Sequence, residues 1–257
     1  MSIFAHYLQF LVSHIQNDCF MKKIFSKIAL VTLLLVLCGS SAFAQQSKYT
    51  KKGNKALAQN DEEKAAHYFY CGAMFDQSKT AFDTLEAMAD RGSQDANMLM
   101  GAFYQQGVMV EKDLAKAISL YQKAEKFNLK YLIKALENEL NNAYGNDPDS
   151  LDRNTIYTLT EKAPEFPGGM EAMMATLSRN TIYPEYARNL KLAGTVLVKF
   201  VVEKDGRMDG FTIVVPLHPI LDNETIRSLS TLPKWKPGLL NGKPVRCYYQ
   251  IPMTFRM

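Results

Sequence analysis

Apolar and polar positions follow two different patterns along this chain. Between residues 49 and 142 the sequence has no proline, and small, aromatic and aliphatic residues recur at helical spacing. From residue 163 onward prolines become frequent, and short stretches alternate between apolar and polar positions. The pattern predicts successive helices over 49–142, a linker over 143–162 and a mixed helix and strand domain over 163–257.

The helical region contains an internal repeat. An alanine, an aromatic residue and a small residue occur twice with the same spacing, over 65–72 and 117–124, and each copy follows a glycine, Gly53 or Gly101. Small residues at such spacings allow two helices to approach closely, and the aromatic ring fills the gap beside them. Residues 130–140 keep a helical apolar period and are expected to cap the array.

Downstream, the pattern predicts a small antiparallel sheet backed by helices, an α+β domain. Val196, Val198, Phe200 and Val202 share one face of its first strand. Two helices are expected first, at 170–177 with Met173, Met174 and Leu177 on one face, and at 184–190. Strands at 195–203 and 208–215 follow, joined by a turn at Asp205 and Gly206. A helix at 221–229 with Asp222 as its N-cap and a final strand at 248–255 complete the domain.

The only tryptophan, Trp235, lies between Pro233 and Pro237, just before Gly238. Proline lacks an N–H donor and restricts the residue before it, so this stretch is not helical. A large ring on an extended or turning backbone packs at a core edge or at an interface. Because Trp235 falls between the last predicted helix and the last strand, we expect it to fix the turn that directs this strand along the sheet.

The N-terminal segment has the order of a secretory signal peptide. A basic stretch precedes an apolar stretch too short to span a bilayer comfortably, and a small-x-small site ends at Ala44. This order predicts a signal peptide at 21–44 and an upstream extension at 1–20, with Met21 as an alternative start. Lipidation at Cys38 and an uncleaved membrane anchor are the second and third alternatives to cleavage after Ala44.

Charge and residue types argue against several function classes. The formal charge of +4 is spread along the chain without a basic patch interleaved with aromatics, so nucleic-acid binding is not expected. After cleavage His67, His218, Cys71 and Cys247 remain, and they form neither a metal-ligand pattern nor a Ser-His-Asp set. We therefore expect no enzyme, no metal and no cofactor. Two buried thiols are favoured for the cysteines, while a disulfide between them stays open.

The helical region resembles tetratricopeptide arrays. Residues 95–125 are similar to a repeat of the Sel type, through positions that include Leu99, Gly101, Tyr104 and Tyr121, and residues 49–77 resemble an ordinary tetratricopeptide unit. This resemblance implies a scaffold that binds another protein, whose identity the sequence does not give. The alternative is a small helical domain that packs on its neighbour and binds nothing.

Residues 163–257 resemble the TonB C-terminal domain family. The matching motifs occur in the family's order and include Tyr183 and Pro184, Asp205 and Gly206, Leu221 and Asp222, and Pro233, Trp235, Pro237 and Gly238. The resemblance implies recognition without catalysis, in which an exposed strand pairs with a short segment of an outer-membrane transporter. In such strand addition, main-chain hydrogen bonds supply affinity and alternate side-chain pockets supply selectivity.

By this resemblance the pairing edge is the last strand. On that strand one face carries the side chains of Tyr248, Gln250, Pro252, Thr254 and Arg256. Pro252 cannot donate to a strand ladder, which fits an edge strand better than a central one. A free edge of this kind also leaves a homodimer open.

The chain departs from an energy-transducing TonB in two respects. No proline precedes Pro148, so the proline-rich spacer is absent, and the apolar N-terminal segment has the form of a cleavable one. The main expectation is a periplasmic TonB-like protein that serves energy-dependent transport across the outer membrane. The alternative is a soluble periplasmic adaptor without energy transduction. Membrane association is expected only if the apolar segment is retained or Cys38 is lipidated.

Overall fold

The computed structural model describes residues 48–144 and 155–257 of the chain. The signal peptide predicted at 21–44 and the extension at 1–20 lie outside these residues, as does part of the predicted linker. Within the described ranges, no helix combines the length and the apolar character needed to cross a membrane.

Helices fill the first described stretch, as its proline-free sequence predicts. They are residues 48–58, α3 (Glu62–Asp76), α4 (Lys79–Asp90), α5 (Gln94–Gln106), α6 (Leu114–Lys123), the short 3₁₀ turn η1 (Glu125–Phe127) and α7 (Lys130–Tyr144). From α3 to α6, each helix begins after a side chain that accepts the backbone N–H three residues on; these N-caps are Asp61, Ser78, Ser93 and Asp113. The caps satisfy N–H groups that a helix leaves free in its first turn, which explains where these helices begin.

Two contacts between a glycine and an aromatic ring bring neighbouring helices close together. A Cβ atom at Gly53 would lie 2.8 Å from a ring carbon of Phe69, and a Cβ atom at Gly101 would lie 2.7 Å from one of Tyr121. Only glycine permits such an approach without displacing the ring. The repeated spacing in the sequence therefore marks two close helix crossings, and the arrangement is compatible with helical repeats.

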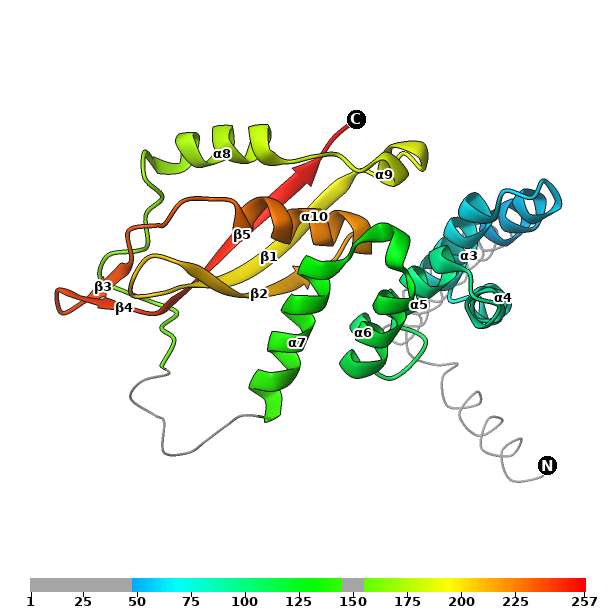
Figure 1. Cartoon of the computed structure of the whole chain (residues 1–257), viewed down its shortest axis with the longest axis horizontal. Coiled ribbons are helices and arrows are strands. Elements are labelled where there is room, and N and C mark those ends of the chain that lie inside the picture. Colours follow the sequence, from blue (N-terminus) through cyan, green and yellow to red (C-terminus); the bar gives the residue numbers. More distant parts are fainter. Residues whose placement is uncertain (1–47, 145–154) are drawn as a thin grey trace, which may run out of the picture.

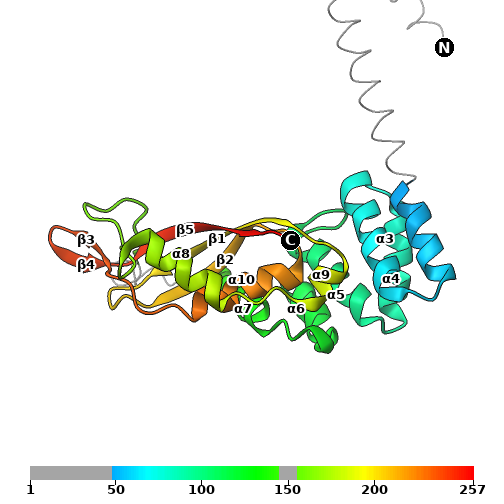
Figure 2. The same ribbon diagram turned by 90° about the horizontal axis from the view of Figure 1, so that it is seen from above.

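The second described stretch forms an α+β domain. Its elements are α8 (Gly169–Asn180), α9 (Glu185–Asn189), β1 (Gly194–Val202), β2 (Met208–Val215), α10 (Pro219–Ser230), β3 (Gly238–Leu240), β4 (Lys243–Val245) and β5 (Cys247–Phe255). The main sheet has the order β2-β1-β5 with both pairings antiparallel, and β3 and β4 form a separate hairpin. Helices α8 and α10 lie on the same side of this sheet, and α8 runs beside β5 (Figures 1 and 2).

The core of this domain confirms the predicted inner face of β1. Val196, Val198, Phe200 and Val202 are all fully buried, and α10 packs on the face that they form. Alternation along the strand places the intervening side chains on the opposite face. The predicted period of two thus fixes which side of the sheet the helices cover.

Helix α10 begins earlier than the sequence pattern predicts. Its first residue is Pro219 and its N-cap is His218, whose Nδ1 accepts the N–H of Ile220 at 3.4 Å, so the prediction of Asp222 as N-cap was wrong. Proline suits the first turn of a helix because no N–H is needed there. The carboxylate of Asp222 is buried and accepts the N–H of Leu217 at 3.0 Å, which holds the loop before the helix.

The helical region docks on the α+β domain through a cap supplied by α10. Oδ1 of Asn223 accepts the N–H groups of Tyr131 and Leu132, each at 3.1 Å. These groups belong to the first turn of α7, where the helix itself offers no acceptor. Nδ2 of Asn223 also donates to the carbonyl of Asn128 at 3.4 Å. One side chain of α10 therefore fixes the beginning of α7.

Trp235 packs into the core at the point where the two hairpins meet. Its ring centroid lies 4.8 Å from that of Tyr249, and 5.7 Å from those of both Phe166 and Phe200. The backbone N–H of Trp235 donates to the carbonyl of Gly206 at 2.8 Å. Gly206 has a φ of 82°, and a Cβ atom there would lie 2.0 Å from the carbonyl oxygen of Trp235. Glycine at the β1–β2 turn thus allows the tryptophan segment to lie directly on it.

Substitution of Asn223 by alanine should loosen the docking of α7. Loss of the shared acceptor leaves two N–H groups unpaired, and each such loss costs about 1–3 kcal/mol. In amide hydrogen exchange, the N–H groups of Tyr131 and Leu132 should exchange faster in Asn223→Ala. Asn223→Asp keeps an acceptor oxygen at the same place and serves as the control that retains protection. Equal exchange in the two variants would contradict the capping role.

Substitution of Trp235 by alanine should lower the free energy of unfolding of the α+β domain. The change removes a buried ring and its aromatic contacts, which typically costs about 3–5 kcal/mol. Urea unfolding monitored by circular dichroism measures the effect, with Lys234→Ala as a control at the neighbouring exposed position. An unchanged unfolding midpoint in Trp235→Ala would show that the ring does not support the core.

Candidate functional site

Strand β5 lies at one edge of the main sheet. Each of its nine residues, from Cys247 to Phe255, is in register with β1, and within the described residues no named strand lies on its other side. An edge strand of this length presents a row of backbone N–H and C=O groups to an incoming chain. The edge is therefore a candidate site for pairing with another strand.

Part of this edge is already occupied by a segment of the same chain. Tyr157 forms a parallel bridge with Cys247: its N–H donates to the carbonyl of Arg246 at 2.9 Å, and its carbonyl accepts the N–H of Tyr248 at 3.0 Å. The backbone groups of Tyr248 therefore point away from β1. Because the direction of backbone groups alternates along a strand, every second residue from Tyr248 onward points to the same outer edge.

This alternation identifies the backbone groups that remain open. Gln250 and Thr254 each direct an N–H and a C=O outward, while Pro252 directs only a C=O because proline has no N–H. The hydrogen bonds of the described residues assign no backbone partner to these outward N–H groups. Proline thus occupies an outer position, where it breaks none of the bonds between β5 and β1.

The five residues predicted to share one face of the last strand lie as follows. Gln250, Pro252, Thr254 and Arg256 are exposed, and Tyr248 is half-buried. The hydroxyl groups of Thr254 and Thr195 are 3.0 Å apart, and Nζ of Lys199 lies 4.8 Å from the ring centroid of Tyr248. The outer face of β5 is therefore polar and reaches across to β1.

A groove between α8 and the C-terminal half of β5 flanks the open edge. It has a volume of about 560 Å³, and its lining includes Met174, Leu177, Thr181, Met253 and Phe255. The sequence pattern placed Met174 on one face with Met173 and Leu177, but those two are buried whereas the side chain of Met174 is 50% exposed. Exposed methionine beside an open edge provides an adaptable apolar surface. This surface was not identified as part of the site from the sequence.

Most residues of the predicted structural motif lie away from the open edge, whereas Tyr183 lines the groove beside it and packs on Phe255. The hydroxyl of Tyr183 donates to the carbonyl of Leu192, and Pro184 is the N-cap of α9. Leu221 and Asp222 lie within α10, while Asp205 and Gly206 form the β1–β2 turn on which Trp235 rests. Pro233 is exposed, Pro237 is half-buried, and Gly238 lies so close to Cys247 that a Cβ atom would be 2.7 Å from its Sγ.

Titratable residues gather where the helical region meets the α+β domain. The ring of His218 lies 6.4 Å from that of His67, 6.1 Å from that of Tyr70 and 5.6 Å from that of Tyr186. Burial lowers the pKa of His67 to about 4 and that of His218 to about 3, with His67 adding to the shift of His218. Both imidazoles are therefore neutral near pH 7, which suits a packed interface.

Cys71 and His67 lie close together but do not form a reactive pair. The Sγ of Cys71 is 3.6 Å from Nε2 of His67. Burial raises the pKa of the Cys71 thiol to about 12, so the sulfur stays protonated beside a neutral imidazole. A cysteine nucleophile needs a thiolate, which this environment disfavours. Across residues 48–144 and 155–257, no group of three His, Cys, Asp or Glu residues is arranged to hold a metal ion.

The second described stretch is a small α+β module with an open strand edge, and it follows an array of helices in the chain. Residues 179–257 match the family model described as Gram-negative bacterial TonB protein C-terminal, and this part of the chain is a TonB C-terminal domain. The family is non-enzymatic and periplasmic, and it interacts with outer-membrane proteins. No match was found among curated proteins or among solved structures.

Acidification should destabilise the protein between pH 6.5 and about 4. The lowered pKa values of His67 and His218 provide stability that is present above pH 6.5 and is lost as the pH falls toward those values. Asp222 acts in the opposite direction, because burial raises its pKa to about 7 and the native state then holds one more proton than the unfolded state. The two imidazoles outweigh this one carboxyl, so acidification leaves a net loss in the free energy of unfolding on the order of 1 kcal/mol per pH unit.

Urea unfolding at intervals across this pH range measures the slope. His218→Asn removes one titrating imidazole and keeps a side chain suited to an N-cap, so its stability should depend much less on pH. A slope in His218→Asn equal to that of the unmodified protein would contradict this assignment.

Proposed function

We propose that this protein binds a partner by strand addition at the open edge of β5 and serves energy-dependent transport across the outer membrane. The observation that carries the proposal is the outer edge of β5, on which Gln250 and Thr254 have free N–H groups and Pro252 occupies a position that needs none. The match of residues 179–257 to the TonB C-terminal family supports an outer-membrane transporter as the partner.

The geometry of the edge suggests how the partner segment is held. Its backbone would pair with the outward groups of Gln250, Pro252 and Thr254, which supplies affinity without regard to sequence. Its side chains would alternate between the polar outer face of β5 and the groove beside Met174. Large apolar side chains at every second position fit that groove, so the partner's alternate residues supply the selectivity.

The helical region and the N-terminal segment extend this proposal. We expect export by the signal peptide at 21–44, with a membrane anchor or a lipid on Cys38 as the alternatives, and tetratricopeptide-type helices that hold a second protein. A dimer formed through two β5 edges would compete with partner binding, because both use the same backbone groups.

The second candidate is a soluble periplasmic adaptor without energy transduction. The sequence favours it in one respect, because no proline precedes Pro148 and a proline-rich spacer is therefore lacking. Both candidates share the same binding edge. They differ in whether the mature chain begins after Ala44 or keeps its apolar segment, which mass spectrometry of the exported protein distinguishes.

Substitution of Gln250 by proline should abolish strand addition while leaving the sheet intact. The change removes an N–H that points outward and places a ring on the open edge, and it leaves the ladder between β5 and β1 complete. Gln250→Ala removes the same side chain but keeps the N–H. Fluorescence anisotropy measures the binding of a panel of synthetic peptides that cover the periplasmic segments of outer-membrane transporters.

We expect the dissociation constant of Gln250→Pro to be larger by roughly tenfold or more, because a main-chain hydrogen bond and close approach of the partner strand are lost. Gln250→Ala should bind nearly as well as the unmodified protein. Thermal unfolding of both variants checks that the sheet is retained. Equal binding by the two variants would mean that the partner does not use this edge.

A further inference from the structure

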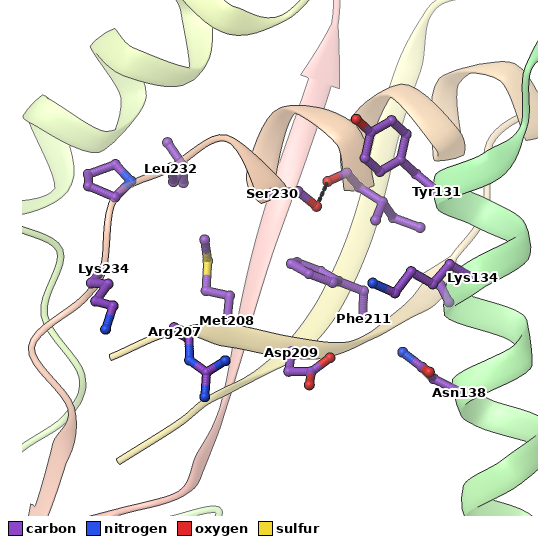
Figure 3. Close-up of a pocket in the computed structure, with 13 residues that line it drawn as sticks. Tyr131, Lys134, Asn138, Arg207, Met208, Asp209, Phe211, Ser230, Leu232 and Lys234 are labelled. Carbon is purple, nitrogen blue, oxygen red and sulfur yellow. Dashed lines mark hydrogen bonds between the residues drawn. The ribbon is translucent and has the colours of Figure 1, made fainter. Parts of the chain in front are cut away.

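A second hollow lies where α7, β2 and the end of α10 meet. This cleft has a volume of about 360 Å³, within the range typical of small-molecule sites, and has room for roughly a dozen water-sized groups. One wall comes from the helical region and the other walls come from the α+β domain (Figure 3). The cleft therefore exists because Asn223 caps α7 and holds it beside the sheet.

The floor of the cleft is apolar. Phe211 and Met208 of β2 form the floor together with Leu232, which follows α10. Figure 3 shows the ring of Phe211 on β2, below α10 and beside α7. The Phe211 ring is itself supported from the core, since its centroid lies 5.6 Å from that of Phe200. An aromatic ring fixed in this way offers a flat surface for the apolar body of a ligand.

Three polar side chains of α7 border this floor, and none of them makes a side-chain hydrogen bond or ion pair within the described residues. Tyr131, Lys134 and Asn138 lie on one face of the helix, and Figure 3 shows Lys134 and Asn138 extending toward β2. The side-chain hydrogen bonds and ion pairs of the described residues include none made by these three groups. By contrast, Lys112 and Lys126 of the same helical region are bound to Glu139 and Asp95.

At the other end of the cleft, cations and carboxylates balance each other. Arg207 and Lys234 share a single carboxylate, Asp205, with nitrogen–oxygen distances of 2.6 and 3.5 Å. Asp205 lies outside the lining, which holds one acid of its own, Asp209, whose carboxylate accepts the N–H of Gly210. With Lys134 included, three cations face two carboxylates, so the cleft favours a ligand with one negative charge.

We propose that this cleft binds a small amphipathic organic anion, a carboxylate with an aromatic or aliphatic body. The body lies on Phe211 and Met208, and the carboxylate meets Lys134 and Asn138. Such a ligand contacts α7 and β2 together, so its binding stabilises the docked arrangement of the helical region and the α+β domain by mass action. The site is separate from the β5 edge, on the opposite side of β1 in the sheet.

Isothermal titration calorimetry of the full mature chain with 4-phenylbutyrate tests the proposal. The alcohol 4-phenylbutanol has the same apolar body without the charge, and 1-anilinonaphthalene-8-sulfonate provides a fluorescent anion of the same class. We expect saturable binding of both anions at one site and binding of the alcohol that is weaker by about tenfold or more, since one charge-assisted contact is lost.

Variants assign the binding to this cleft. Lys134→Ala should weaken binding of both anions by about tenfold, and Asn138→Trp should block it by filling the mouth of the cleft. Lys123→Ala removes an exposed lysine of α6 outside the lining and should bind as the unmodified chain does. Gln250→Pro should also bind normally, which separates this site from the β5 edge.

Two results would overturn the proposal. The first is the absence of saturable binding by both anions in a chain that is folded by circular dichroism. The second is binding that persists at full strength in Asn138→Trp and Lys134→Ala, which would place the bound anion elsewhere on the protein.

Discussion

The antiparallel pairing of β1 with β5 is the interaction on which the rest of this structure depends. Because β1 is flanked by β2 on one side, the pairing leaves β5 at the other edge of the sheet. The same register that buries Ile251 and Phe255 against the helices turns the backbone of Gln250 and Thr254 outward. Core formation and exposure of the open edge are therefore two consequences of one pairing.

Two supports hold this pairing in place and connect it to the helical region. Trp235 rests on the β1–β2 turn through Gly206 and packs on Tyr249 of β5. The tryptophan therefore fixes the N-terminal end of the last strand relative to this turn. At the other side, His218 and Asn223 of α10 join the helices to the sheet. Helix α10 packs on both α7 and β1, so it connects the helical array to the strand that pairs with β5.

Much of this architecture could be predicted from the sequence, because its strongest signals are local. The period of two in β1, the Asp-Gly turn and the glycine–aromatic spacing each reflect one backbone requirement that a short stretch reveals. The order of motifs in residues 163–257 then pointed to a TonB C-terminal domain, as the match at residues 179–257 shows. An Asn241-Gly242 turn, a usual hairpin signal, could also have predicted the hairpin of β3 and β4.

The remaining features depend on contacts between distant segments. Neither the bridge of Tyr157 on β5 nor the cap that Asn223 gives to α7 has a sequence signal, because the bridge joins residues 90 positions apart and the cap joins residues 91 and 92 positions apart. The sequence pattern predicts Asp222 as the N-cap of α10, whereas in the structure Pro219 opens the helix and His218 is the N-cap. Exposure of Met174 likewise follows from where α8 lies beside β5, which helical periodicity alone does not determine.

Amide hydrogen exchange at β5 in the presence of a bound transporter peptide tests the central claim most directly. Strand addition predicts new protection of the N–H groups of Gln250 and Thr254, which point outward, with little change at Ile251 and Met253, which already pair with β1. Protection confined to the helical region, or none on β5 while the peptide is bound, would contradict the account.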